Sequence, residues 1–595
     1  MADAVRKDRL QRRDFLLLGT ICLLFFGHAL VIGRVLSMHE SILPQTAREM
    51  FQDHDWMIPK NGGRPWLEKP PLPQWITVGV ASLLGRCDAE WIVRIPPILM
   101  GTTCVLLVAW MSGLWFGRAV GWLSGLILAT FWQFQRYATY AEADIFLCAI
   151  VTGAVALFVR ATFAEKPDDR VRFFGWRSAS TLGFFALLGL TNLVKGPLFG
   201  AVMVLVPVLG FLLLSRDGSG LRRYAWFWGG LIFLFLASFW PVQAYLRQPD
   251  VLELWRSDHV GRLSEGYIAE PTWYYALHLW WLLLPWTPLA LAGMWSAART
   301  AWTERRSPQR FLWCWALLPP LVFSLPDGKH HHYLLQCLAP WSVFAALGAV
   351  RVWQWLLAWP DHWRQPWLVT ACWGAPALVL LAIFGKGLPG PDWLRPTLFL
   401  AAPLIIFTLC WAVFRRKGQH AMFGVFGVLM SLYIVGLTYK AHWLDRCRPD
   451  TEFLAHARPL AAPGQALFIN VDHDSMESFR LQFYVGEQAR VLHNLSFLRD
   501  DRIREEELLV IARQKFARQL AEYGTAQMLL QSPQTRREES PADRWTLFQV
   551  RLHPNLERGS ATVPLTQLQI TDRARGPYLG PLTTSGVKRV QGGLP

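Results

Sequence analysis

The chain has 595 residues, of which 53% are hydrophobic, 14% aromatic and only 17% charged, and its formal net charge is +16. An average soluble domain carries about 25% charged residues. This composition, with its many apolar runs, therefore excludes an ordinary soluble protein and indicates a polytopic α-helical membrane protein. The positive charge does not indicate a nucleic-acid partner, because lysine and arginine cluster in short connections between apolar runs, as the positive-inside rule describes.

Apolar runs long enough to cross a membrane recur from the N-terminus to about residue 440. The first follows a basic segment, 1–14, and we read it as an uncleaved anchor, because it is too long for a signal peptide and lacks a small-residue cleavage site. Residues 73–90 are a further candidate, for a helix along the membrane interface. About thirteen spans are expected, at 15–37, 91–113, 119–137, 144–163, 179–194, 196–214, 225–245, 274–294, 311–325, 333–350, 368–385, 394–414 and 421–439.

The connections between these runs alternate between basic and nearly uncharged ones. Basic connections face the cytoplasm, so the N-terminus is predicted to be cytoplasmic and the odd-numbered spans to exit on the outer face. The short connections of the other set hold little beyond Lys195, Lys329 and Lys386. The basic set includes Arg6, Lys7, Arg9, Arg12, Arg13, Lys166, Arg170, Arg172, Arg177, Arg216, Arg222, Arg223, Arg299, Arg305, Arg306, Arg310 and the run 415–417.

The chain changes character after the transmembrane part, which is expected to cover 15–440. Residues 441–565 are predicted to form a small α/β domain on the periplasmic side, with strands at "GQALFINVDH" and "WTLFQVRL". The intervening "REEELLVIARQKFARQLAEYG" is predicted to be an amphipathic helix. Residues 566–595, rich in Gly, Thr and Pro, are expected to be poorly ordered.

Polar residues gather on the predicted outer face, in two long loops, about 38–90 and 246–273, and at the outer ends of several spans. Charge at membrane depth is costly unless it is paired or faces a cavity, so it marks a candidate site. Lysine and arginine suit a phosphate group, and a carboxylate suits deprotonation of an acceptor hydroxyl. The outer set comprises Glu40, Glu68, Lys69, Asp144, Lys195, Arg256, His259, Arg262, Asp327, Lys329 and His330.

Several of these residues also have purely structural interpretations. Glu68 and Lys69 suit an exposed loop ion pair, and Asp144 suits the N-cap of the helix that it opens. Lys195 suits a side chain that extends along apolar surface to the interface. Arg94, at the start of a span, either binds a lipid headgroup or anchors its helix. The three histidines at 330–332 cannot all point one way, so we expect interfacial residues there rather than a metal site.

A series of short motifs follows in order along this face: "HES", "REM", "EKPPLPQW", "VRIPP", "EAD", "VKGP", "WRSDHVGR" with "EPTWYY", and "LPDGKHHHYLL". Over about residues 15–440 the chain resembles bacterial polyprenyl-phosphate-dependent glycosyltransferases of the GT-C fold. That group includes lipid A aminoarabinose transferases and relatives of protein O-mannosyltransferases. The C-terminal part is similar only in being a small outer domain.

The resemblance implies roles for several residues. Lys69 would contact the lipid phosphate, next to Trp66, which stands where the family often has Tyr. Glu68 would hold a metal or orient the loops together with His259, so a divalent cation is compatible with the site but not required. The other implied phosphate ligands are Lys195, Arg256, Arg262 and Arg94; Asp327, Lys329 and His330 would line the site, and Asp144 would be a catalytic carboxylate.

The first outer loop departs from the family pattern. The family has Asp-Glu there, with the Asp as catalytic base, whereas this chain has His39 followed by Glu40. Three interpretations stay open: His39 is the base, Glu40 is the base after a small shift, or the chemistry is lost and the binding site kept.

The sequence thus predicts an all-α polytopic membrane protein of GT-C type, with a C-terminal α/β extracytoplasmic domain, in a bacterial inner membrane. It would move a sugar from a polyprenyl-phosphate donor to a lipid, protein or glycan acceptor on the outer face, with no required cofactor. One alternative is a non-catalytic partner that binds lipid-linked sugar through the same face. Another is a transporter or flippase, which usually shows paired half-repeats.

Overall fold

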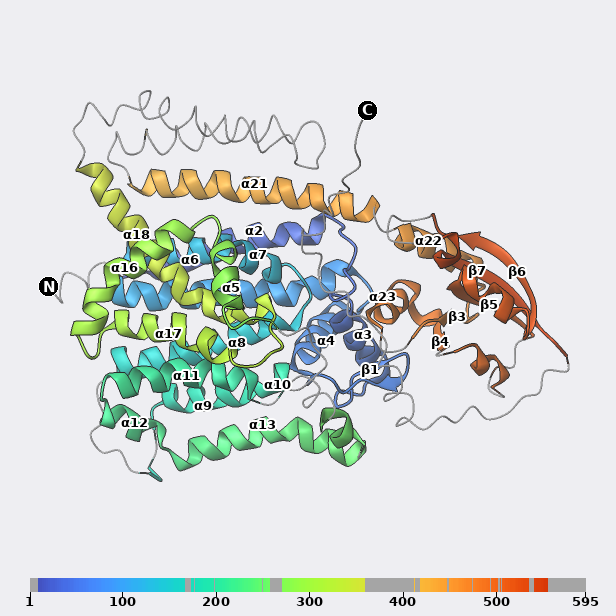
Figure 1. Cartoon of the computed structure of the whole chain (residues 1–595), viewed down its shortest axis with the longest axis horizontal. Helices are drawn as coiled ribbons and strands as arrows, with labels where there is room; N and C mark the ends of the chain where they lie inside the picture. Colours follow the sequence, from blue (N-terminus) through green and yellow to red (C-terminus); the bar gives the residue numbers. More distant parts are fainter. Residues whose placement is uncertain are drawn as a thin grey trace, which may run out of the picture.

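The protein is mostly helical, and its helices run side by side along the long axis of the molecule, with an α/β unit at one end (Figure 1). This is a computed structural model, and it describes residues 9–165, 173–175, 177–196, 198–248, 250–256, 270–358, 411, 418–446, 449–472, 475–492, 494–500, 503, 506–533 and 540–554.

Most helices of the bundle are apolar, and several of them are long. The helices are α2 (Arg12–Val31), α5 (Glu90–Phe116), α6 (Arg118–Thr130), α7 (Trp132–Ala138), α8 (Ala143–Val159), α9 (Ala179–Leu190), α10 (Asn192–Lys195), α11 (Phe199–Leu214), α12 (Gly218–Tyr224), α13 (Phe227–Arg247), α15 (Tyr274–Leu282), α16 (Thr287–Thr303), α17 (Pro308–Phe323), α18 (Leu338–Leu357) and α21 (Gly418–Arg446). A π-helical turn (Arg160–Ala164) extends α8, and a 3-10 helix (His331–Cys337) precedes α18.

Several of these helices are long and apolar enough to cross a membrane. Within the described part of the chain five segments qualify outright: Arg12–Val31, Glu90–Phe116, Ala143–Ala164, Phe227–Arg247 and His331–Leu357. Shorter apolar helices lie at Leu72–Leu84, Arg118–Thr130, Ala179–Lys195, Phe199–Leu214 and Met422–Thr438. The chain is thus a multi-pass membrane protein, and the count of thirteen spans stays a prediction, because 368–385 and most of 394–414 lie outside the described residues.

One predicted span differs from expectation. Instead of a single helix over 274–294, the chain forms α15 and α16, which are bent by 112° relative to each other. Pro285 lies in the break, and proline lacks the N–H group that a continuing helix needs. The prediction of one straight span was therefore wrong at this point, and the pair counts as one broken span or a re-entrant turn.

Close helix contacts depend on small residues. A side chain added at Gly293 of α16 would place its first carbon 1.7 Å from the carbonyl oxygen of Phe344 in α18, and one at Gly348 would lie 2.1 Å from the carbonyl oxygen of Leu289. Both helices can approach this closely only because glycine stands at each contact, a common device of helices in membranes.

Between the bundle and the α/β unit lies a layer formed by the segment after α2. It contains α3 (Ile42–Asp53), a two-stranded hairpin of β1 (Lys60–Asn61) and β2 (Arg64–Pro65), and α4 (Leu72–Leu84) (Figure 1). The helix expected at 73–90 is therefore present but ends at Leu84, where Gly85 adopts a left-handed conformation with a φ of 71°.

The α/β unit is built on a five-stranded mixed sheet with the order β4-β3-β5-β7-β6. Its strands are β3 (Leu467–Asn470), β4 (Ala489–Leu492), β5 (Glu507–Arg513), β6 (Gly524–Gln531) and β7 (Trp545–Leu552), and its helices include α22 (Pro449–Ala457) and α23 (Met476–Val485). Strands β3 and β7 match the two predicted strands. Strand β3 pairs in parallel with β4 and β5, and β7 runs antiparallel to β5 and β6.

The predicted amphipathic helix in this unit was wrong over its first part. Leu508–Ala512 is an unbroken buried run that forms the middle of the sheet, and only Gln514–Leu520 adopts short helical turns. A strand that is buried on both faces reads as a continuous apolar run, which periodicity alone does not distinguish from a buried helix. The predicted disordered tail, 566–595, lies outside the described residues.

Candidate active site

Three segments meet at the end of the bundle nearest the α/β unit. They are the stretch between α2 and α3, the stretch before α4, and the connection between α7 and α8. Together with Val194 of α10 they line a small pocket. Its lining residues are His39, Ile42, Leu43, Trp66, Lys69, Pro70, Pro73, Gln74, Ala141, Glu142, Ala143 and Val194. Two of the residues predicted for catalysis and phosphate binding, His39 and Lys69, thus share one pocket.

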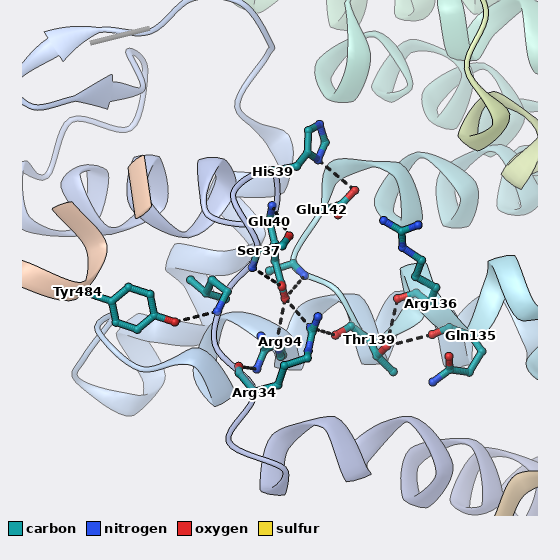
Figure 2. A network of polar contacts seen from close by, with 12 residues as sticks. Arg34, Ser37, His39, Glu40, Arg94, Gln135, Arg136, Thr139, Glu142 and Tyr484 are labelled. Carbon is teal, nitrogen blue, oxygen red and sulfur yellow. Dashed lines mark hydrogen bonds and ion pairs between the residues drawn. The ribbon is translucent and has the colours of Figure 1, made fainter. Parts of the chain in front are cut away.

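His39 is paired with a carboxylate across the pocket. Its Nδ1 atom lies 3.2 Å from Oε2 of Glu142, a residue that sequence reasoning did not single out (Figure 2). The Glu142 side chain is 4% exposed, whereas that of His39 is 42% exposed. A buried carboxylate therefore fixes one ring nitrogen, Nδ1, of an accessible imidazole.

Glu40, the neighbour of His39, is held in a different environment. Its carboxylate is fully buried and accepts hydrogen bonds from Arg34 Nη2 at 3.0 Å and from Arg94 Nε at 2.9 Å (Figure 2). It also accepts from the backbone N–H groups of Ser37 at 3.2 Å and Ala141 at 3.2 Å. Glu40 thereby ties the segment that carries His39 to the segment that carries Glu142.

The two arginines also set the charge of Glu40. Burial alone would raise the pKa of this carboxyl, but the charges of Arg34 and Arg94 and the hydrogen bonds outweigh it and lower the pKa to about 2. Glu40 is therefore ionised at neutral pH and surrounded by cations, an environment that makes a carboxylate a weak base.

Replacing Glu40 with glutamine is expected to destabilise the protein by about 3 kcal/mol, because two buried guanidinium groups lose their counter-charge. Since the folded-state pKa lies below the ordinary value, the stabilisation is present above about pH 4.5 and is lost as the pH falls from there towards 2. Thermal unfolding of the purified protein between pH 3 and 7 measures both effects. The exposed Lys60–Asp53 pair offers the control Asp53→Asn, and equal melting curves for the Glu40→Gln and Asp53→Asn variants would contradict this assignment.

Lys69 lies in the pocket with Trp66, and Glu68 beside it is exposed. Trp66 is buried and packs edge-to-face on Phe479 of α23, with ring centroids 5.9 Å apart. Pro70 and Pro71 stiffen the chain directly after Lys69; Pro71 is the N-cap of α4 and Pro73 lies in its first turn. The lysine is therefore presented from a fixed loop that is packed against the α/β unit.

A second ion pair lies close to the pocket, between two residues that were predicted as site residues. Lys195 Nζ is 2.6 Å from Oδ1 of Asp144, and the lysine also lies over the ring of Tyr333 at 4.7 Å. Asp144 is the second residue of α8, whose N-cap position is taken by Glu142. The positive charge of Lys69 also interacts favourably with the Asp144 carboxylate. The pair joins the start of α8 to α10.

Replacing one member of this buried pair is expected to reduce stability more than replacing both members. Lys195→Met leaves the Asp144 carboxylate without its partner, so we expect a loss of about 3 kcal/mol, whereas the double variant Lys195→Met/Asp144→Leu should recover much of it. Melting temperatures of the two variants in the same detergent test this. If the double variant melts below the single one, the residues do not act as a pair.

The remaining predicted residues are spread around this end of the molecule. Arg94 is buried and engaged by Glu40, and its Nη1 donates to the carbonyl oxygen of Arg34 at 2.7 Å. Arg256 is exposed at the end of a described helical stretch, 251–256, and Asp327 is exposed. Lys329 is buried and donates to the carbonyl oxygen of Glu270 at 2.8 Å. The His330 ring stacks on that of His332 with centroids 5.2 Å apart.

The suggested cation site cannot be assembled from the described residues. His259 and Arg262 lie outside them, and within them no group of three or more His, Cys, Asp or Glu side chains is placed to hold a metal ion. Glu68 and His259 as metal ligands, and Arg262 as a phosphate ligand, stay predictions.

Sequence reasoning missed Glu142, Arg34 and Arg136. Glu142 belongs to the "EAD" motif, and it is the Glu of that motif, two residues before Asp144, that reaches the pocket. Arg34 lies over the ring of Tyr140 at 3.8 Å, and Arg136 lies over the rings of Tyr137 at 5.5 Å and Tyr140 at 5.3 Å. Both arginines stand at the ends of apolar runs, where a basic residue is ordinarily read as an interfacial anchor.

The fold matches a solved structure over most of the chain. The structure of ArnT from Cupriavidus metallidurans bound to undecaprenyl phosphate superimposes with a TM-score of 0.67, covering 90% of this chain and 97% of that one, at 18% identity. The same protein in its apo state gives a TM-score of 0.66. The chain therefore has the GT-C fold that its motifs suggested.

Sequence comparisons point to the same class. Residues 68–245 match the profile of the family described as dolichyl-phosphate-mannose-protein mannosyltransferase. Undecaprenyl phosphate-alpha-4-amino-4-deoxy-L-arabinose arabinosyl transferase from Pectobacterium atrosepticum is 27% identical over 71% of this chain and 75% of its own length. The enzyme of that name from Shewanella sediminis is 25% identical over 62% of this chain and 71% of its own length. These matches confirm the resemblance, and the chain is a membrane glycosyltransferase.

Proposed function

We propose that this chain transfers a sugar from a polyprenyl-phosphate donor to an acceptor hydroxyl of a lipid, protein or glycan at the outer face of the bacterial cytoplasmic membrane. The observation that carries this proposal is the shared pocket of Lys69 and the His39–Glu142 pair. A cation for the phosphate and a base for the acceptor are the two groups that such a transfer needs. The similarity to undecaprenyl-phosphate-dependent relatives supports the class of donor.

His39 is the proposed general base. The acceptor hydroxyl gives its proton to Nε2 of His39 while its oxygen forms a bond to the anomeric carbon, and the bond from that carbon to the phosphate oxygen breaks. Glu142 holds the Nδ1–H group and stabilises the imidazolium that results. A single displacement of this kind inverts the anomeric configuration. Glu40 supports the site as a buried anchor of both segments, a role that suits its low pKa better than proton abstraction.

Lys69 is proposed to bind the phosphate and to stabilise the charge that develops on the leaving group. Lys195 is already engaged by Asp144, so its contribution would be to fix α8 beside the pocket. Arg256 and Arg262 remain proposed phosphate ligands on the second long loop, and Arg94 is assigned instead to the buried cluster around Glu40. A divalent cation at Glu68 and His259 is an optional addition to this scheme.

The predicted topology supports this placement. Arg118 pairs with Asp14 in the first turn of α2, Arg306 pairs with Asp217 at the N-cap of α12, and Arg310 donates to the carbonyl oxygen of Leu214 at the end of α11. Helix α12 lies at the end of the bundle opposite the α/β unit (Figure 1). With that basic end in the cytoplasm, the pocket, the α/β unit and the thirteenth span's exit all belong to the periplasmic side.

Transfer by the purified protein in lipid nanodiscs, supplied with a panel of radiolabelled polyprenyl-phosphate sugars and outer-envelope acceptors, tests the proposal. We expect labelled acceptor to accumulate with at least one donor. Binding of undecaprenyl phosphate without transfer from any donor would instead indicate a binding partner. If the protein shows no binding of undecaprenyl phosphate and no transfer from any donor, the assignment is overturned.

A further inference from the structure

The α/β unit is packed directly against the segments that carry the catalytic pair. One buried apolar cluster contains Leu36 from the His39 segment, Ala141 next to Glu142, and Phe483 from α23. Leu36 and Ala141 are completely buried, and Phe483 is 3% exposed. The hydrophobic contact between the α/β unit and the bundle therefore lies immediately behind the pocket.

Polar contacts across this interface are buried and mutually satisfied. Arg48 Nη1 in α3 donates to the carbonyl oxygen of Phe483 at 2.8 Å, and Gln482 Nε2 donates to Oδ1 of Asn61 at 2.6 Å. All three polar side chains, Arg48, Gln482 and Asn61, are less than 7% exposed. Buried polar groups that satisfy each other from both sides are typical of a fixed interface rather than of two domains that move freely.

Tyr484 makes the contact that reaches nearest to the catalytic residue. The backbone N–H of Leu36 donates to the Tyr484 hydroxyl at 2.7 Å, three residues before His39 (Figure 2). Burial, with a smaller contribution from the Glu90 charge, raises the pKa of Tyr484, so its hydroxyl stays neutral. On the other side of His39, Glu40 is held by Arg34 and Arg94. The segment is thus fixed at two points that flank His39.

We propose that the C-terminal α/β unit is a working part of the active site, and that Tyr484 is a positioning residue that holds the 34–40 segment so that His39 faces Glu142. The inference rests on the proposed function. Tyr484 is not one of the described residues that line the pocket, so it acts through the backbone of Leu36. A general base must lie within hydrogen-bond reach of its proton, and small displacements reduce the rate strongly.

The variant Tyr484→Phe removes the hydroxyl and keeps the ring. We expect the turnover number to fall about tenfold, because one hydrogen bond that orients the base is lost, while the affinity for undecaprenyl phosphate stays unchanged. Amide hydrogen exchange over residues 34–41 should become faster in the full-length protein in nanodiscs. Tyr523→Phe is the matched control, because Tyr523 is also a buried tyrosine of the α/β unit. It belongs to a different apolar cluster, with Leu508 and Phe548 of the sheet, and not to the cluster that contains Leu36 and Ala141.

The two readouts separate this inference from the proposed function. Faster exchange over 34–41 in Tyr484→Phe alone, together with lower turnover at equal donor affinity, supports a positioning role. Unchanged exchange, or loss of turnover equal to that in Tyr523→Phe, overturns it. If the wild type transfers no sugar, the proposed function fails, and the exchange measurement still decides whether Tyr484 orders the segment.

Discussion

Replacing Lys69 with methionine is expected to lower the rate of sugar transfer by about a hundredfold or more and to weaken binding of undecaprenyl phosphate. The variant keeps the length and apolar stem of the side chain and removes only the charge. Lys69 lines the pocket shared with His39 and Glu142, so the lost charge is the one that would face the phosphate in the ground state and as it leaves.

A matched control is available in the same segment. Lys60 is engaged by Asp53 at 2.8 Å in an exposed pair, so Lys60→Met removes a cation of equal charge at a distance from the pocket. Donor affinity measured by titration and single-turnover rates should separate the two variants. Similar behaviour of Lys69→Met and Lys60→Met would exclude Lys69 as the phosphate ligand.

The second large effect is expected at the proposed catalytic pair, His39 and Glu142. His39→Ala should lower the transfer rate by about a thousandfold at unchanged donor affinity, because a general base contributes about 10² to 10⁴ to the rate. Since the His39 side chain is 42% exposed, added imidazole should reach the vacated space and restore part of the activity. Glu142→Gln should cause a smaller loss, about tenfold, because it leaves the base in place but removes its charged partner.

Rescue separates a base from a structural histidine. His456→Ala, at an exposed histidine of α22, should match the wild type with and without imidazole. An inactive His39→Ala variant that imidazole does not rescue, combined with a matching loss in Glu40→Gln after correction for folded protein, would move the role of base to Glu40.

The sequence was a good guide to which segments meet and a poor guide to which side chains pair. The prediction of one long outer loop, about 38–90, placed His39 and Lys69 in the same loop, and in the structure both line one pocket together with Trp66. The partners of Glu40 and Lys195 were missed because Arg94 is 54 residues from Glu40, and Asp144 is 51 residues from Lys195. Helix packing determines which of these side chains pair, and a hydropathy pattern does not predict how helices pack.

Strand β5 was misread for a related reason. Its residues Leu508–Ala512 are buried on both faces of the sheet, so the chain there has no polar alternation to mark a strand. The same principle explains why α15 and α16 read as one span, since apolar composition continues through the break at Pro285. In both places the tertiary environment, and not local periodicity, determines the structure.

The most direct test is a side-by-side transfer assay of wild type and His39→Ala, in the same nanodiscs and with the same labelled polyprenyl-phosphate sugar. We expect that both proteins bind the donor equally, that only the wild type labels the acceptor at a measurable rate, and that added imidazole restores part of the activity of the variant. Equal transfer by the two proteins would contradict the assignment of His39, and no transfer by the wild type with any donor of the panel would contradict the catalytic role itself.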